Sequence, residues 1–265
     1  GDPHLYFSEQ NWDMQESGVA LSVNPGAYLK LNFVNSSFVG LRLRPVATGS
    51  AAREGQGDAA VAGNSDVGVG SDSAGRPAPP PAFVDGQYMN LIYSIDNGEY
   101  VIVPVFNDST EITLAENLGD SDLSKPHTLV LYIYNSLQIN RWENPAHSGS
   151  ALLVQGIALN ASAATVAPTL RSKRALIFGD SITEGCAAQC KPDPSCHADK
   201  TKGDLCTNAA TKTWGPTVAA ALDAEFSQVG FGGLGWLVGG GGGVPPFYTP
   251  HNDTRSSWNK IWRGS

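Results

Sequence analysis

The 265-residue chain has few basic residues and no long apolar segment. Lys and Arg total 17 against 25 Asp and Glu, which gives a formal net charge of −8. This balance, with no basic cluster longer than residues 171–174, argues against nucleic acid as a partner. No apolar run approaches the roughly 20 residues that a membrane-spanning helix needs. No signal peptide is visible at Gly1, as expected of a mature or trimmed terminus.

Cysteine is also scarce, and its four copies lie in one segment, at Cys186, Cys190, Cys196 and Cys206. Such clustering predicts two disulfides that close a loop. A zinc site is the alternative, although the segment lacks paired Cys-x-x-Cys spacing and His197 is its nearest histidine. Four cysteines allow three pairings, so the sequence leaves the connectivity open.

Four Asn-x-Ser/Thr sequons occur, at Asn35, Asn107, Asn160 and Asn252. Such sequons are acceptors of N-linked glycans in secreted proteins. Together with the clustered cysteines, they predict a secreted or extracellular glycoprotein.

Short alternating or apolar runs separated by turns fill most of residues 1–165, and they include residues 28–33, 38–43, 88–95 and 128–134. Asp96-Asn97-Gly98 follows one such run and predicts a β-hairpin. We therefore expect an antiparallel β-sandwich over residues 1–165. Trp12 and Trp142 lie in this part, where we expect them to pack in the core rather than contact a glycan.

Residues 47–82 interrupt the sandwich pattern. They contain no aromatic residue, Leu or Ile, and include the run Pro79-Pro80-Pro81. Because such a segment buries too little apolar surface to offset its ordering entropy, it predicts a disordered insertion. Residues 162–173 are expected to form a linker.

The periodicity changes beyond this linker. Residues 175–178, Ala-Leu-Ile-Phe, predict a buried parallel strand. Apolar side chains then recur every fourth residue at Trp214, Val218, Leu222 and Phe226. This spacing predicts a helix that packs on the sheet, with Thr213 as its N-cap and Pro216 in its first turn. Strand, loop and helix indicate the first unit of an α/β domain over residues 171–265.

Gly179-Asp180-Ser181 follows the predicted strand and places a serine in a tight turn at the carboxyl edge of the sheet, where α/β proteins bind ligands. A serine hydroxyl there can attack a carbonyl if a base removes its proton and N–H groups hold the oxyanion. Gly, Asp and Ser are also ordinary turn formers, so the tripeptide alone is a weak signal.

The longer string of residues 179–185, Gly-Asp-Ser-Ile-Thr-Glu-Gly, resembles the first block of the SGNH/GDSL hydrolases, in the form typical of esterases that act on carbohydrates. The resemblance implies that Ser181 is the nucleophile of a flavodoxin-like α/β domain and that no metal or organic cofactor is required. The preceding sandwich resembles the jelly-roll domain of two-domain carbohydrate acetylesterases.

Residues 229–236 resemble the glycine block of this family. We match Gly233 to the glycine whose N–H helps to form the oxyanion hole, and Gly235 is the neighbouring alternative. A side chain at that point would keep the backbone from approaching the substrate oxygen. The glycine run at residues 239–243 is interpreted as a flexible loop. Asp180 is expected to stabilise the turn rather than to transfer protons.

Two later blocks of the family are missing from these residues. One is Gly-x-Asn-Asp, which supplies an asparagine to the oxyanion hole, and the other is Asp-x-x-His, which supplies the base. Asn252-Asp253 lacks the preceding strand and glycine. None of the histidines, His4, His127, His147, His197 and His251, follows an aspartate at the family spacing. Residues 257–263 resemble the segment before the third block, so we expect a chain truncated before the third and fifth blocks.

Two functions are compatible with these residues. The first is a secreted serine esterase that removes acetyl or short acyl groups from a polysaccharide or glycan, with Ser181 and Gly233 in its active site and a histidine beyond residue 265 as base. The second is a non-catalytic extracellular glycan-binding or structural protein that retains an SGNH-like fold. The missing base is the main argument for the second.

Overall fold

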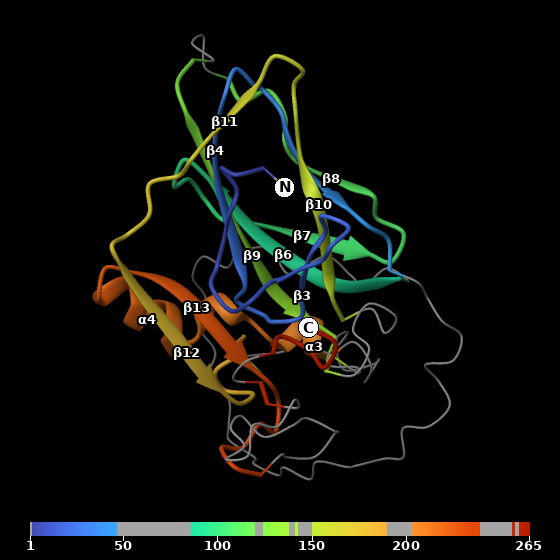
Figure 1. The fold of residues 1–265 in the computed structure, drawn as a ribbon, viewed down its shortest axis with the longest axis vertical. Coiled ribbons are helices and arrows are strands. Elements are labelled where there is room, and N and C mark those ends of the chain that lie inside the picture. The colour runs from blue at the N-terminus through green and yellow to red at the C-terminus, as the bar shows by residue number, and fades with distance from the viewer. Residues whose placement is uncertain are drawn as a thin grey trace, which may run out of the picture.

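The computed structural model describes residues 2–46, 86–119, 124–137, 141–142, 150–189, 203–238, 256–257 and 260–265. They form an antiparallel two-sheet sandwich and a smaller parallel unit at the end of the described chain (Figure 1). The predicted order of a sandwich followed by the start of an α/β domain is confirmed. The predicted insertion at residues 47–82 lies outside the described residues.

Each sheet of the sandwich has a fixed antiparallel strand order. One sheet runs β1 (Tyr6–Phe7), β4 (Tyr28–Val34), β9 (His127–Ser136), β6 (Gln87–Ile95) and β7 (Val101–Phe106), with β11 (Ala164–Val166) also beside β4. The other runs β2 (Asp13–Met14), β3 (Ala20–Ser22), β10 (Leu152–Leu159), β5 (Val39–Leu43) and β8 (Glu111–Ala115). We call them the first and second sheet.

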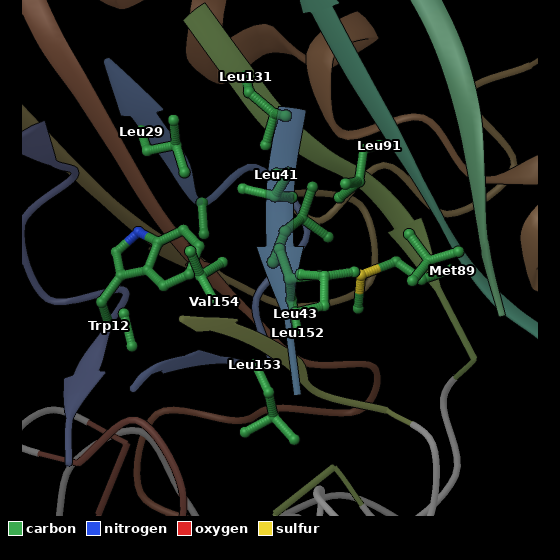
Figure 2. Close-up of a cluster of buried hydrophobic side chains, with 14 of the residues drawn as sticks. Trp12, Leu29, Leu41, Leu43, Met89, Leu91, Leu131, Leu152, Leu153 and Val154 are labelled. Carbon is green, nitrogen blue, oxygen red and sulfur yellow. The ribbon is translucent and has the colours of Figure 1, made fainter. Parts of the chain in front are cut away.

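The core lies between the two sheets because their strands alternate in period two. Leu29, Leu31 and Phe33 of β4 point inward and are fully buried. They belong to one continuous cluster with side chains of the second sheet. Figure 2 shows part of this cluster, with Leu29 of the first sheet and Leu41 and Leu152 of the second. Trp12 and Trp142 are buried at 8% and 3% exposure, which confirms that they pack rather than face solvent.

The predicted hairpin joins β6 to β7. Asp96 and Asn97 have φ values of 54° and 58°, and the Gly98 N–H donates to the Ile95 carbonyl at 2.9 Å. Two successive positive φ values define a type I′ turn, which matches the twist of paired strands. The β-hairpin predicted from Asp96-Asn97-Gly98 is therefore confirmed.

The parallel unit consists of two strands joined through helices. β12 (Lys173–Gly179) is followed by α3 (Gly203–Thr207), η2 (Ala210–Lys212) and α4 (Trp214–Ala221), and β13 (Ala224–Gly230) returns beside β12. All seven residue pairs of β12 and β13 are in parallel register, from Lys173 with Ala224 to Gly179 with Gly230. No helix in the described part of the chain is long and apolar enough to span a membrane.

This unit packs on the outer face of the first sheet. Tyr28, whose side chain points away from the sandwich core, joins Ile177, Ala219 and Phe226 in a second apolar cluster. A third cluster brings Ala209 against Ile92 and Tyr134 of the same sheet. The first sheet therefore lies between the second sheet and the parallel unit, which covers part of its outer face.

Helix α4 presents a different face to the sheet than its sequence pattern predicts. Its buried residues are Gly215 and Ala219, whereas Trp214, Val218 and Leu222 are exposed at 49%, 40% and 51%. The helix ends at Ala221, so Phe226 lies in β13 instead of continuing the stripe. The small residues face the sheet because α4 lies very close to it: a Cβ on Gly215 would lie 3.0 Å from the Phe226 ring and 3.2 Å from Ile177. Only small residues fit at this contact.

Two further predictions from the sequence, the linker at residues 162–173 and the N-cap of α4, need correction. The predicted linker at residues 162–173 contains β11, which pairs with β4. Thr213 occupies the N-cap position of α4, but its hydroxyl donates to the Ala210 carbonyl at 3.2 Å rather than capping the helix. Pro216 lies in the first turn, as predicted.

Strand β13 is buried along its whole length. Its polar side chains lie in the contact between the parallel unit and the sandwich, which we call the seam. The Asn11 amide donates to the Gln228 carbonyl at 2.6 Å. The Gln228 amide in turn donates to the Pro25 carbonyl at 3.2 Å. A Cβ on Gly26, which has a φ of +93°, would lie 2.9 Å from Gln228 Nε2.

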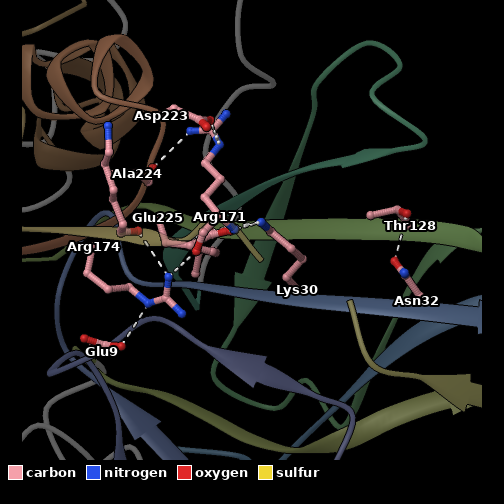
Figure 3. Close-up of polar contacts among 11 residues, drawn as sticks. Glu9, Lys30, Asn32, Thr128, Arg171, Arg174, Asp223, Ala224 and Glu225 are labelled. Carbon is pink, nitrogen blue, oxygen red and sulfur yellow. Dashed lines mark hydrogen bonds and ion pairs between the residues drawn. The ribbon is translucent and has the colours of Figure 1, made fainter. Parts of the chain in front are cut away.

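Glu225 is the buried charged residue of β13. Its carboxylate accepts hydrogen bonds from Lys30 Nζ at 2.8 Å and from the Arg171 N–H at 2.9 Å (Figure 3). The Tyr28 hydroxyl also donates to it. Burial disfavours the ionised carboxylate, but these hydrogen bonds outweigh it and lower the pKa of Glu225 below its ordinary value. Glu225 thus joins the sandwich, the segment before β12 and β13.

The pH dependence of stability should reflect this carboxylate. A lowered pKa means that its contribution is complete above the unfolded pKa of about 4.3 and is lost as the pH falls through the lower folded value. Glu225→Gln should therefore unfold more easily at pH 7, while the difference from the parent shrinks below about pH 4. Urea unfolding at several pH values measures this, and a pH-independent difference would contradict it.

Candidate functional site

Ser181 lies in the turn that follows β12 and is half-buried. The Asp180 carboxylate accepts the Ile182 N–H at 3.0 Å, and the Asp180 carbonyl accepts the Glu184 N–H at 3.2 Å. The Ser181 carbonyl accepts the Cys186 N–H at 2.8 Å. Asp180 therefore stabilises the turn through its side chain, as expected. We call residues 180–186 the nucleophile turn.

Two glycines make this turn possible. A Cβ on Gly179 would lie 2.0 Å from the Thr183 hydroxyl, because the buried Thr183 side chain folds under the end of the strand. Gly185 has a φ of +92°, and a Cβ there would lie 2.5 Å from the Ala209 carbonyl oxygen. Neither position has room for a side chain, so steric exclusion explains why both residues of the motif are glycine.

A pocket opens beside this turn, with a volume of about 300 Å³. Its walls come from the end of β12, the first turn residue and the segment after β13, namely Phe178, Gly179, Asp180, Leu234, Gly235 and Trp236. Trp236 is 62% exposed. The pocket thus lies at the carboxyl ends of parallel strands, where α/β folds bind ligands.

The two glycines proposed for the oxyanion hole have different positions. Gly233 has a φ of +77° in a turn closed by the Leu234 N–H and the Phe231 carbonyl at 3.0 Å. Gly235 lines the pocket, and a Cβ there would lie 2.2 Å from the Val238 carbonyl oxygen. The assignment of the oxyanion donor to Gly233 stays a prediction. Residues 239–243 lie outside the described residues.

The two histidines that the structure describes lie in the sandwich. His4 Nδ1 is 3.0 Å from the Thr165 hydroxyl. His127 is the first residue of β9, and its Nδ1 is 2.7 Å from the Asp96 carboxylate. Further along β9, Val130 and Tyr132 pack against the parallel unit, and the Asn135 amide donates to the Asn208 carbonyl at 2.7 Å. His147, His197 and His251 lie outside the described residues.

The cysteines do not form the expected pair of disulfides. Cys186 is a free, exposed thiol, and Cys206 is disulfide-bonded. Cys190 and Cys196 lie outside the described residues. Because Cys186 is free, the expectation that all four cysteines pair is wrong. Although the residue is exposed overall, partial desolvation of its thiol is the largest factor that raises the pKa of Cys186, and the neighbouring Glu184 and Asp204 add to it.

Three of the sequons lie on described residues. Asn35 and Asn160 are exposed at turns of the sandwich, and Asn107 is half-buried. The Asn160 Oδ1 accepts the Ser37 N–H at 2.9 Å. Asn252 lies outside the described residues. Glycosylation stays a prediction at all four.

A buried ion pair lies next to Ser181 and was not predicted from the sequence. Arg141 Nη2 lies 2.5 Å from the Glu184 carboxylate, and the two side chains are 3% and 1% exposed. Glu184 belongs to the motif, but Arg141 comes from the sandwich part and lies 43 positions earlier. No local pattern marks it. In the described part of the chain, no three His, Cys, Asp or Glu residues are grouped so as to hold a metal ion.

The described residues thus combine an antiparallel sandwich with a parallel unit that carries a serine at the end of its first strand. Comparison with solved structures confirms the resemblance in fold. No family model and no curated protein sequence matches the chain. The following similarities, all at low sequence identity, concern the fold.

A family two carbohydrate esterase from Cellvibrio japonicus aligns with a TM-score of 0.59 and 15% identity, over 98% of this chain and 58% of its own. A family 2 carbohydrate esterase from Corynascus thermopiles aligns at 0.55 and 17%, over 97% and 58%. A family two carbohydrate esterase from Clostridium thermocellum, in complex with cellohexaose, aligns at 0.56 and 14%, over 95% and 60%. The chain therefore spans less than two thirds of each neighbour.

Gly185→Ala tests the steric requirement of the nucleophile turn. Gly18→Ala is a matched control, because Gly18 has a φ of +77° but no atom within 4 Å of the added Cβ. The control should cost about 1–2 kcal/mol from backbone strain alone. The Gly185 variant should cost about 3 kcal/mol or more, since strain and overlap add. Urea unfolding measures both, and equal losses would contradict the steric account.

Proposed function

We propose that this chain carries the nucleophile and part of the substrate pocket of a serine esterase that acts on acylated carbohydrate. One observation supports this most directly. Ser181 lies in a sterically constrained turn at the carboxyl end of a parallel strand, and Asp180 beside it lines a pocket. Such a turn presents a serine hydroxyl to a bound ester.

In this proposal the Ser181 hydroxyl attacks the ester carbonyl and forms a tetrahedral intermediate. The N–H groups of Ser181 and Gly233 hold the developing oxyanion. A general base from outside the described residues takes the serine proton and returns it to the departing alcohol of the sugar. Water then releases the acyl group. No step assigns a proton to Asp180, whose carboxylate is used in the turn.

The proposed substrate is an acetyl or other short acyl ester of a polysaccharide or glycan. The three structural neighbours described above are carbohydrate esterases, and one was solved with cellohexaose. A pocket of about 300 Å³ suits a small acyl group with part of a sugar ring. An extracellular location, glycans at the sequons and a disulfide-bonded loop beside the site belong to the same proposal.

A second function has an observation in its favour. Neither histidine that the structure describes contacts the nucleophile turn. A protein without a base would keep the pocket and bind a glycan without hydrolysing it. In one fold neighbour, which aligns at a TM-score of 0.53 and 12% identity, the active site of a carbohydrate esterase displays divergent catalytic and non-catalytic binding functions.

Ser181→Ala separates the two functions. We expect hydrolysis of 4-nitrophenyl acetate by the full-length protein to fall at least about 1,000-fold, because no other group replaces the nucleophile. Ser172→Ala, at an exposed serine before β12, should retain full activity. Equal rates for the parent and the Ser181 variant would exclude serine-esterase catalysis. Retained binding of cello-oligosaccharide without turnover would support the second function.

Trp236→Ala tests the sugar side of the pocket. The exposed indole offers a flat apolar face to a sugar ring at the pocket wall. We expect KM for acetylated polysaccharide to rise about tenfold, while kcat/KM for 4-nitrophenyl acetate changes less than about twofold, because the aryl ester has no sugar to bind. Trp214→Ala, at an exposed tryptophan of α4, is the control. Parallel losses on both substrates would contradict this role.

A further inference from the structure

A charged residue of the sandwich part reaches the nucleophile turn. Arg141 Nη2 lies 2.5 Å from the Glu184 carboxylate, three residues after Ser181. Both side chains are almost fully buried, at 3% and 1% exposure. Removing two charges from water is costly unless they are paired with each other and satisfied by further hydrogen bonds. The Arg141 guanidinium has such further partners in addition to Glu184.

The guanidinium is held from several directions. Its Nη1 donates to the Val23 carbonyl at 3.2 Å, directly after β3, and its Nη2 lies 3.5 Å from the Gly230 carbonyl at the end of β13. The Phe231 ring lies 4.8 Å from the guanidinium carbon, in the arrangement of a cation–π contact. Arg141 therefore has a fixed position that depends on both the sandwich and the parallel unit.

The position of Glu184 decides the course of the nucleophile turn. Its N–H donates to the Asp180 carbonyl at 3.2 Å and so closes the turn around Ser181. A Cβ on Gly230 would lie 2.8 Å from the Glu184 Cβ, so the turn rests directly on the end of β13. The carboxylate held by Arg141 thus fixes the backbone on which Ser181 stands.

We infer that Arg141 is a positioning residue: through Glu184 it holds the nucleophile turn, and with it the Ser181 hydroxyl, in its attacking position. The inference rests on the proposed function of Ser181. It assigns to the sandwich part a direct role in the geometry of the site. Displacement of a reacting group by about 1 Å can cost two orders of magnitude in rate.

The test uses the full-length protein with three variants of this pair. Glu184→Gln keeps the shape of the side chain and removes its charge. Arg141→Lys keeps the positive charge but loses the planar fork. The double variant Arg141→Met with Glu184→Met removes both charges and keeps apolar volume. Arg42→Met with Glu111→Met, at an exposed ion pair of 3.4 Å in the second sheet, is the matched control.

We expect both single variants to lower kcat for 4-nitrophenyl acetate about 10- to 100-fold, with KM nearly unchanged. The double variant should recover Tm relative to Glu184→Gln, because no unpaired charge is left buried, yet retain the kcat defect. The control should match the parent in both. Recovery of kcat together with Tm in the double variant would overturn the inference, because the pair would then act through stability alone.

Amide hydrogen exchange gives a readout that does not depend on activity. In peptides that cover residues 179–189, exchange should accelerate at least about tenfold in the single and double variants while peptides from β4 and β9 keep their rates in the double variant. If the parent shows no Ser181-dependent hydrolysis, the proposed function fails and exchange alone decides the positioning role. Unchanged exchange at residues 179–189 in all three variants would overturn that role.

Discussion

The complete burial of β13 is the constraint on which the rest of the structure depends. The strand has the sandwich beside it and β12 along one edge, and it brings Glu225, Ser227 and Gln228 into the interior. Buried polar groups destabilise a fold unless each finds a partner. The partners here come from the amino-terminal part, through Asn11, Lys30 and Tyr28. The parallel unit is thus specified by polar complementarity with the sandwich as well as by apolar burial.

Contacts in the same seam also hold the segments around the candidate site in place. The Asn135 amide of β9 donates to the carbonyls of Leu205 at 3.1 Å and Asn208 at 2.7 Å, and Asn208 in turn accepts the Ala187 N–H at 3.0 Å. These bonds link the first sheet to the segment that follows the nucleophile turn. Arg141 makes the corresponding connection at Glu184. A loop that would be mobile on an isolated two-stranded unit is therefore tied to a larger scaffold.

The sequence predicted those features that depend on local rules. Alternation located the strands of the sandwich, Asp96-Asn97-Gly98 specified the hairpin, and the motif around Ser181 located the turn and its glycines. Features that depend on distant partners were missed or wrong. The stripe beginning at Trp214 has helical spacing, but whether it faces the sheet depends on how closely α4 approaches Phe226. The importance of Arg141 likewise depends on Glu184, which no periodicity connects to it.

The contact between Gly26 and Gln228 has a consequence for how the sequence can change. The end of the Gln228 side chain occupies the space that any side chain at position 26 would need, although the two positions are 202 residues apart. A larger residue at 26 would fit only with a shorter one at 228, and the positive φ would still disfavour it. Mutational drift at the two positions should therefore be coupled, so that each restricts the substitutions accepted at the other.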